Sequence, residues 1–421
     1  MPKSHLLKSL ILLALGLHVV WVGTAWNRTV QVRHGRDFAS YYYAFKSTQD
    51  GGNPYSKEVL GQYAKKERTR SSVHPYLYPP PFLLMMEWTR PLSLQTSFRL
   101  WFWFGELAAL AALLAMCRWV RPLGPGAVTL CVIGFSVCTA VPNNHAMGQA
   151  NFFVLLAVIL AFVLESEKRS VLAGVLLGLG ILMKISPALL LVFWVVERRW
   201  KACIASVLTG IVGHLLVFFM YGSTVIEYFY FEVFPGFSAG QYNGLRVPIE
   251  MFGNHSLPNL WHQWMPGTGQ GLSMGAQWAS RVTSLVLVVA TLWVGRTATS
   301  SRFSIVLRWS SILLMMLLIP VYTYEHHLIW AMPAVAITAL AVIQGRVPLP
   351  LFPILGLAWM GWAFSLARLK QWAQWCVQAE YPMSFAWLLQ EWKTFSCIIL
   401  WIGLMGLIRQ ESRDLRFEGK S

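Results

Sequence analysis

Long apolar segments recur along the whole 421-residue chain and limit what it can fold into. Hydrophobic residues make up 56% of the sequence and charged residues only 12%, which favours a polytopic membrane protein over a soluble enzyme. A run of about twenty apolar residues suffices for a helix to cross a bilayer. This criterion selects about twelve candidate helices, near residues 6–26, 94–118, 126–142, 150–165, 170–184, 186–198, 202–221, 276–296, 303–321, 327–344, 349–367 and 386–408. We therefore predict one all-α integral membrane domain over residues 1–421.

The basic residues predict which end of each helix faces the cytoplasm. The connections on one side of the threaded chain are all basic, as at Lys168-Arg169 and Arg296. By the positive-inside rule, these connections and both termini are cytoplasmic. The first outer loop also holds Lys65 and Arg68, but long loops translocate largely regardless of charge. Orientation and contact with anionic lipids account for the net charge of +16, so we predict no nucleic-acid partner.

Two long loops, at about residues 27–93 and 222–275, are predicted on the outer side. In the first loop, a helix is predicted from Asp37 to Gln49, because Gly51-Gly52-Asn53-Pro54 is a strong stop signal. The stretch from Ser56 to Arg70 is amphipathic and basic, which suits a helix lying among lipid headgroups. Large loops on one side only are unusual for a transporter built from repeated helix pairs.

Rare polar residues among the apolar segments also fall on the outer side. Ionisable groups at membrane depth are costly, so they usually line a cavity or a substrate path. We therefore predict one outer-face site from six clusters, namely Arg36-Asp37, Asn143-Asn144-His145, Gln149-Ala150-Asn151, Lys184, Gly253-Asn254-His255-Ser256 and Glu325-His326-His327.

Asp37 has two possible roles. As an N-cap, its side-chain oxygen would accept amide protons of the first helical turn, and local sequence favours this role. As a general base just above the membrane, it would work beside Arg36, which would help to position a phosphate. The two roles can coexist, because a carboxylate has two oxygens.

The other polar residues are interpreted by their chemistry. Lys184 either snorkels to headgroups or binds phosphate with the amides of the helix start marked by Pro187. Arg246 is the candidate guanidinium for an anionic group in the second loop. Amide, imidazole and phenol groups suit a neutral hydroxylated ligand, and the candidates for sugar or acceptor contacts are Asn144, Gln149, Asn151, Asn254, His255 and Tyr42.

The adjacent His326 and His327 point about 100° apart on a helix, so only one is expected to face the site. Their spacing is not that of a zinc site, and hydrogen bonding to phosphate or to a reacting hydroxyl is the better interpretation. We predict no cofactor and no metal ligand. A divalent metal ion is compatible with the sequence but is not indicated by it.

Six short motifs in order resemble glycosyltransferase family 87 of the GT-C superfamily. They span roughly residues 30–335, and nothing beyond about residue 345 adds to the resemblance. They are Asp37-Phe38-Ala39-Ser40-Tyr41-Tyr42 with Gly52-Asn53-Pro54-Tyr55, Tyr78-Pro79-Pro80, Gly148-Gln149-Ala150-Asn151, Ala173–Gly178 running into Lys184-Ile185-Ser186-Pro187, Asn254-His255-Ser256-Leu257 and Glu325-His326-His327.

The resemblance implies a GT-C-type helix bundle and an α-1,2-mannosyltransferase-like hexosyltransferase that uses a polyprenyl-phosphate sugar. It also implies that Asp37 is the catalytic base of an inverting transfer. The family often has Asn-Gln-Ser where this chain has Asn254-His255-Ser256, which leaves the sugar open.

We therefore expect a cell-membrane enzyme that moves a sugar from a polyprenyl phosphate to a lipid-linked or glycan acceptor at the periplasmic or exterior face. Mannose is the first candidate for this sugar. Lys184, Arg246, Arg36 and one of His326 and His327 would bind the donor phosphate. The alternatives are a transporter or flippase of a lipid-linked sugar, or a ligase that transfers whole glycans.

Overall fold

The computed structural model describes residues 2–30, 35–69, 72–267, 271–297 and 300–418, and within these ranges the chain is helical and contains no strand. The elements are α1 (Pro2–Val30), α2 (Arg36–Gln49), α3 (Lys57–Lys66), η1 (Pro80–Thr89), α4 (Leu94–Val120), η2 (Arg121–Leu123), α5 (Pro125–Val137), α6 (Ala140–Met147), α7 (Asn151–Ser166), α8 (Ser170–Met183), η3 (Ser186–Ala188), α9 (Leu189–Val196), α10 (Trp200–Tyr221), α11 (Thr224–Tyr228), η4 (Phe229–Val233), η5 (Pro235–Ala239), α12 (Leu257–Trp264), α13 (Met274–Arg296), α14 (Arg302–Leu318), η6 (Glu325–Ala331), α15 (Met332–Ile343), η7 (Leu349–Leu351), α16 (Phe352–Ala363), α17 (Leu366–Gln378) and α18 (Met383–Glu418).

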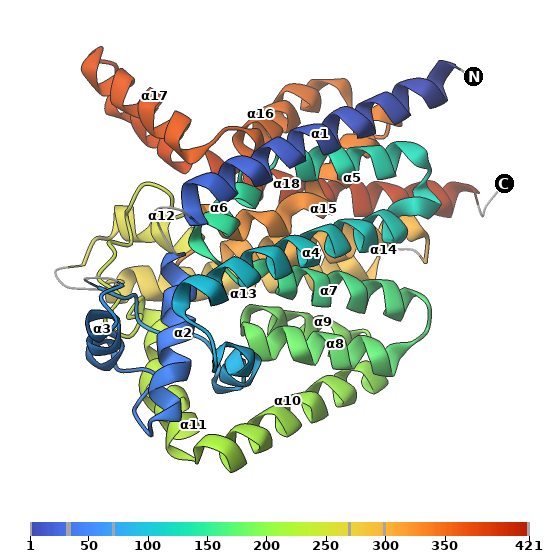
Figure 1. The fold of residues 1–421 in the computed structure, drawn as a ribbon. Helices are drawn as coiled ribbons and strands as arrows, with labels where there is room; N and C mark the ends of the chain where they lie inside the picture. The colour runs from blue at the N-terminus through green and yellow to red at the C-terminus, as the bar shows by residue number, and fades with distance from the viewer. Residues whose placement is uncertain (1, 31–34, 70–71, 268–270, 298–299, 419–421) are drawn as a thin grey trace.

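The long helices form a bundle with distinct ends. The start of α1 and the end of α18 lie at one end, whereas α2, α3, α11 and α12 lie at the other (Figure 1). The segments of the two predicted long loops therefore gather at the end opposite the termini.

Fewer helices have spanning length than the sequence predicts. In the described residues, six helices are long and apolar enough to cross a membrane, or up to eight if two bent pairs each count as one span. The bent pairs are α5–α6, with an angle of 49°, and α16–α17, with 109°. Helices α7 and α8 have only 16 and 14 residues, shorter than the roughly 30 Å apolar core requires at 1.5 Å per residue. The count of about twelve spans is therefore not confirmed.

The two helices expected in the first long loop are present. The first is α2, which ends at the predicted residue Gln49. The second is α3, whose N-cap Ser56 accepts a hydrogen bond from the Val59 amide at 3.3 Å. The sequence interpretation missed α17, because its alternating polar residues keep it below the threshold for an apolar span.

Small residues let α8 and α10 pack closely. A Cβ atom added to Gly174 would lie 2.2 Å from the Ala202 carbonyl oxygen, and one on Gly178 would lie 2.9 Å from that of Ser206. This spacing is the small-xxx-small pattern that brings membrane helices together. It holds α8 against α10, and Lys184 follows the C-terminal end of α8.

A buried carboxylate joins α1 to the rest of the bundle. Glu106 on α4 contacts His18 of α1 at 2.7 Å and His145 of α6 at 3.0 Å. All three side chains are buried, so these contacts compensate for the loss of hydration. They place α6, and therefore the connection to α7, beside α4.

Candidate active site

Asp37 lies in the first turn of α2 but does not cap the helix. The N-cap residue is Gly35, and no side chain makes a capping hydrogen bond there. Instead, Asp37 Oδ1 lies 3.0 Å from Nδ1 of His74, and Oδ2 accepts a hydrogen bond from Nε2 of Gln149 at 2.6 Å. The cap interpretation is therefore wrong, because both carboxylate oxygens are used in tertiary contacts.

The surroundings of Asp37 favour its ionised form. Burial alone would raise the pKa of this carboxyl group, since only 15% of the side chain is exposed. The hydrogen bond with His74, the nearby imidazoles of His326 and His74, and the Gln149 amide together hold the pKa below its usual value. Asp37 is therefore a carboxylate at neutral pH and can accept a proton.

Gln149 reaches Asp37 because α2 packs tightly on the α6–α7 connection. Gly148 has a left-handed φ of 69°, and a Cβ atom there would lie 2.7 Å from the Phe38 side chain. The Gln149 carbonyl oxygen Oε1 accepts from the Tyr78 hydroxyl at 2.7 Å, which in turn accepts from Tyr41 at 2.6 Å. These bonds fix the amide so that its NH₂ group faces Asp37.

A chain of side-chain hydrogen bonds runs from this point to Lys184. Lys184 Nζ donates to Oδ1 of Asn151 at 2.9 Å, and Nδ2 of Asn151 donates to Oδ1 of Asn144 at 3.1 Å. Asn144 donates in turn to the backbone oxygen of Gln149 at 3.3 Å. Lys184 also interacts electrostatically with Asp37, so four of the predicted clusters do come together.

His326 is the member of the histidine pair that interacts with Asp37. It interacts electrostatically with Asp37 and Lys184, and its side chain is buried with Nε2 lacking a hydrogen-bond partner among the described residues. His327 instead uses Nδ1 to accept the Tyr324 amide at 3.0 Å. This bond caps the start of η6 and holds the pair in register.

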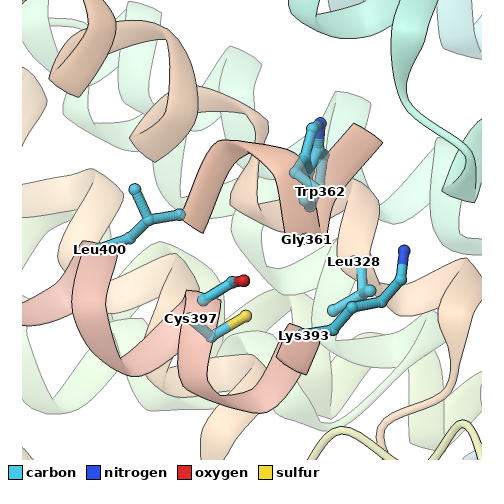
Figure 2. A pocket seen from close by; sticks show the side chains of 7 residues that line it. Leu328, Gly361, Trp362, Lys393, Cys397 and Leu400 are labelled. Atoms are coloured by element: carbon cyan, nitrogen blue, oxygen red, sulfur yellow. The ribbon is translucent and has the colours of Figure 1, made fainter. Parts of the chain in front are cut away.

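A second buried charge cluster supports the residue before His326. Glu325 Oε1 contacts Lys393 Nζ at 2.9 Å and accepts from the Thr139 hydroxyl at 2.5 Å, while Oε2 lies 3.5 Å from His255. Lys393 lies at the edge of a small cavity between η6, α16 and α18 (Figure 2). The cluster joins η6, α18, the start of α6 and the second long loop, which are distant in the sequence.

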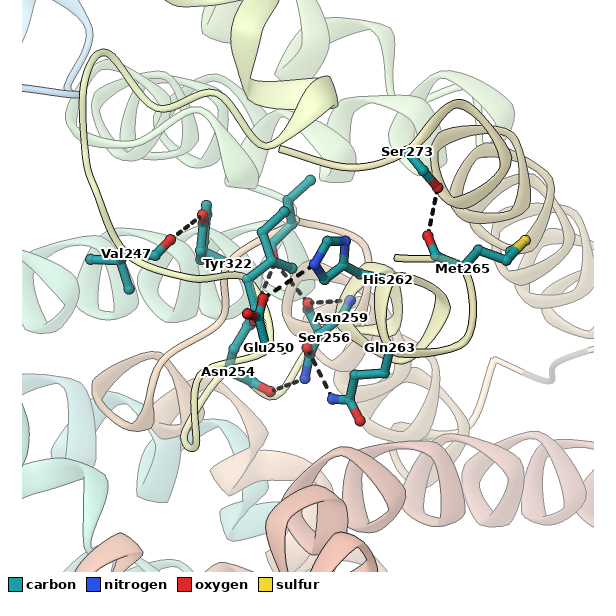
Figure 3. A network of polar contacts seen from close by, with 12 residues as sticks. Val247, Glu250, Asn254, Ser256, Asn259, His262, Gln263, Met265, Ser273 and Tyr322 are labelled. Atoms are coloured by element: carbon teal, nitrogen blue, oxygen red, sulfur yellow. Dashed lines mark hydrogen bonds and ion pairs between the residues drawn. The ribbon is translucent and has the colours of Figure 1, made fainter. Parts of the chain in front are cut away.

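Asn254 connects the second long loop to the segment before η6 through hydrogen bonds of its side chain. Its Nδ2 donates to the backbone oxygens of Ile249 and Val321, at 2.9 and 3.0 Å, and its Oδ1 accepts the Thr323 amide at 3.0 Å. Only 1% of Asn254 is exposed. Figure 3 shows the network around it, which ties this loop to the segment leading into η6.

The side chains of the remaining predicted residues make no hydrogen bond or ion pair with Asp37 among the described residues. Arg36 and Arg246 have exposed side chains. The Tyr42 hydroxyl donates to the Leu92 carbonyl oxygen at 2.8 Å. The ligand contacts predicted for these three residues, for Asn254 and His255, and for the residues around Asp37 all stay predictions.

The sequence analysis missed His74 and Lys393 as parts of this region, and it named Tyr41 and Tyr78 only within the family motifs. A His-Pro pair directly before Tyr76-Leu77-Tyr78-Pro79 was the available signal for His74. Lys393 lay unnoticed inside an apolar run. Among the described residues, no group of three or more His, Cys, Asp or Glu side chains is arranged to hold a metal ion.

The sequence matches a known family of enzymes. The family model of glycosyltransferase family 87 matches residues 76–321, more than half of the chain. The chain belongs to glycosyltransferase family 87. No curated protein and no solved structure matches it. The matched region holds Tyr78, Gln149 and Lys184, whereas Asp37 and His326 lie outside it. Family membership favours the enzyme over the transporter or flippase.

Proposed function

We propose that this glycosyltransferase moves a sugar, mannose as the first candidate, from a polyprenyl phosphate to a lipid-linked or glycan acceptor. The transfer is inverting, and it takes place at the periplasmic or exterior face of a GT-C-type bundle whose termini are cytoplasmic. The observation that carries the proposal is the grouping of a lysine amine, an imidazole whose Nε2 has no partner among the described residues, and a carboxylate, at Lys184, His326 and Asp37.

The first two of these groups suit a phosphate. Lys184 is partly buried and retains donors beyond its bond to Asn151, while His326 Nε2 has no partner in the described part of the chain. A buried polar atom without a partner is costly, so a ligand that engages it is favoured. A phosphate oxygen between the two side chains would satisfy both.

An apolar groove near Lys184 suits the lipid tail of such a donor. The groove has a volume of about 420 Å³ and lies between η1, α8 and α10. Its walls include Leu84, Val175, Leu182 and Leu216. The groove reaches Leu182 in the last turn of α8, which Lys184 follows, and the prenyl chain of the donor is proposed to lie along it.

The proposed reaction needs one proton acceptor and one stabilised leaving group. The acceptor oxygen forms a bond to the anomeric carbon while the bond from that carbon to the phosphate oxygen breaks. Asp37 takes the hydroxyl proton, and the electron pair of the broken bond stays on the departing polyprenyl phosphate. Lys184 and His326 stabilise the charge that develops there. No cofactor has a step in this scheme.

Sugar transfer is expected when the purified protein is incubated with radiolabelled polyprenyl-phosphate mannose and membrane lipids. Lys184→Met should raise the donor KM about tenfold or more and leave the acceptor KM unchanged, because a charge-assisted hydrogen bond is lost. Lys168→Met, which changes an exposed lysine at the other end of α8, is the matched control. Product from none of a panel of polyprenyl-phosphate sugars would refute the donor class.

The proposed orientation predicts which residues an impermeant thiol reagent reaches in intact cells. Single cysteines at the exposed positions Gln62 and Gln241 should react, in a background with the six native cysteines replaced. A cysteine at Lys168 should react only after permeabilisation. The reverse pattern would place the site in the cytoplasm and remove the argument for a lipid-linked donor.

A further inference from the structure

We propose that His74 forms the acceptor side of this site: its Nδ1–H holds Asp37, and its Nε2 binds a hydroxyl group of the incoming acceptor. The inference rests on the proposed function and adds to it the place where the acceptor docks. The ligand class is a polyhydroxylated headgroup, such as the glycan of a glycolipid.

The two oxygens of Asp37 face different surroundings. Oδ2 bonds Gln149, which is linked through Asn144 and Asn151 to Lys184 on the proposed phosphate side. Oδ1 contacts His74. In an inverting transfer, the nucleophile attacks from the face opposite the leaving phosphate, so the acceptor hydroxyl should arrive on the Oδ1 side.

The two imidazoles that interact with Asp37 also differ in exposure. His326, on the phosphate side, is 3% exposed, whereas 38% of the His74 side chain is exposed. His74 lies in the irregular segment between α3 and η1, in the first long loop. An acceptor can therefore reach His74 from the end of the bundle where the long loops lie.

The chemistry of the imidazole fits both contacts. Asp37 is ionised and accepts, so the contact at 3.0 Å requires a proton on Nδ1 of His74. In the neutral ring, Nε2 is then a hydrogen-bond acceptor, and it has no partner among the described residues. A hydroxyl group beside the reacting one can donate to it, which would place the reacting hydroxyl near Asp37.

Two substitutions of His74 separate the two contacts. His74→Asn keeps an N–H donor near the position of Nδ1 but has no atom near Nε2, while His74→Ala removes both. We expect the acceptor KM to rise about tenfold in both variants, because each loses the hydrogen bond to the acceptor. We expect kcat to fall in His74→Ala and to recover in His74→Asn, with the donor KM within about twofold of the parent value in each.

The Lys184→Met variant serves as the internal comparison, because it is expected to raise the donor KM and to leave the acceptor KM unchanged. An unchanged acceptor KM in both His74 variants would overturn the inference and leave His74 as a support for Asp37 only. A raised donor KM would place His74 on the phosphate side and also overturn it. If the parent protein transfers no sugar from any polyprenyl phosphate, the proposed function itself fails. Equal melting temperatures of parent and variants exclude misfolding as the cause.

Discussion

Asp37→Asn is expected to lower kcat at least a hundredfold, because a positioned general base contributes about 10²–10⁴-fold in rate. Asparagine has nearly the same shape and can still accept the His74 hydrogen bond, but it is no base at neutral pH. Donor binding should persist, since Lys184 and His326 are unchanged. The measurement is turnover with polyprenyl-phosphate mannose, together with the donor KM and the melting temperature.

Asp50→Asn is the matched control for this variant. Asp50 lies at the other end of α2, is exposed, and bonds the Tyr63 hydroxyl at 2.5 Å. It should keep nearly full activity. If Asp37→Asn also keeps most of its activity, Asp37 is not the base, and Glu58 or Glu325 becomes the next candidate.

Lys393→Met is expected to destabilise the protein by about 3–5 kcal/mol, the usual cost of removing one partner of a buried ion pair. Lys393 and Glu325 are both almost fully buried, so the Glu325 carboxylate would lose its cation without gaining access to water. The loss should appear as a lower melting temperature in detergent. Activity should fall as well, because Glu325 directly precedes His326.

A double variant distinguishes charge burial from lost packing. Lys393→Met with Glu325→Gln removes both charges and should recover a large part of the lost melting temperature. Lys370→Met is the control, because it removes an exposed lysine on α17, and it should leave the melting temperature unchanged. A double variant as unstable as the sum of the two single variants would show that the ion pair carries no coupling.

The candidate site was predictable in part. Gln149, Asn151, Lys184 and His326 were found from sequence because polar residues are conspicuous in apolar surroundings. His74 was not, since a polar residue in a long loop is unremarkable until its partner is known. The Asp37–His74 contact joins residues from different segments of the first loop, and local sequence favoured a helix cap that the structure does not contain.

The sequence by itself determined that this protein is helical, membrane-embedded and polar at one end. The physical reason is that a helix in a bilayer satisfies its backbone hydrogen bonds locally, so each apolar run determines its own structure. Only the tertiary structure decided where helices bend, how many reach spanning length, and which side chains meet. Those outcomes depend on contacts between distant segments, such as α2 against Gly148 and α18 against η6, which no local pattern encodes.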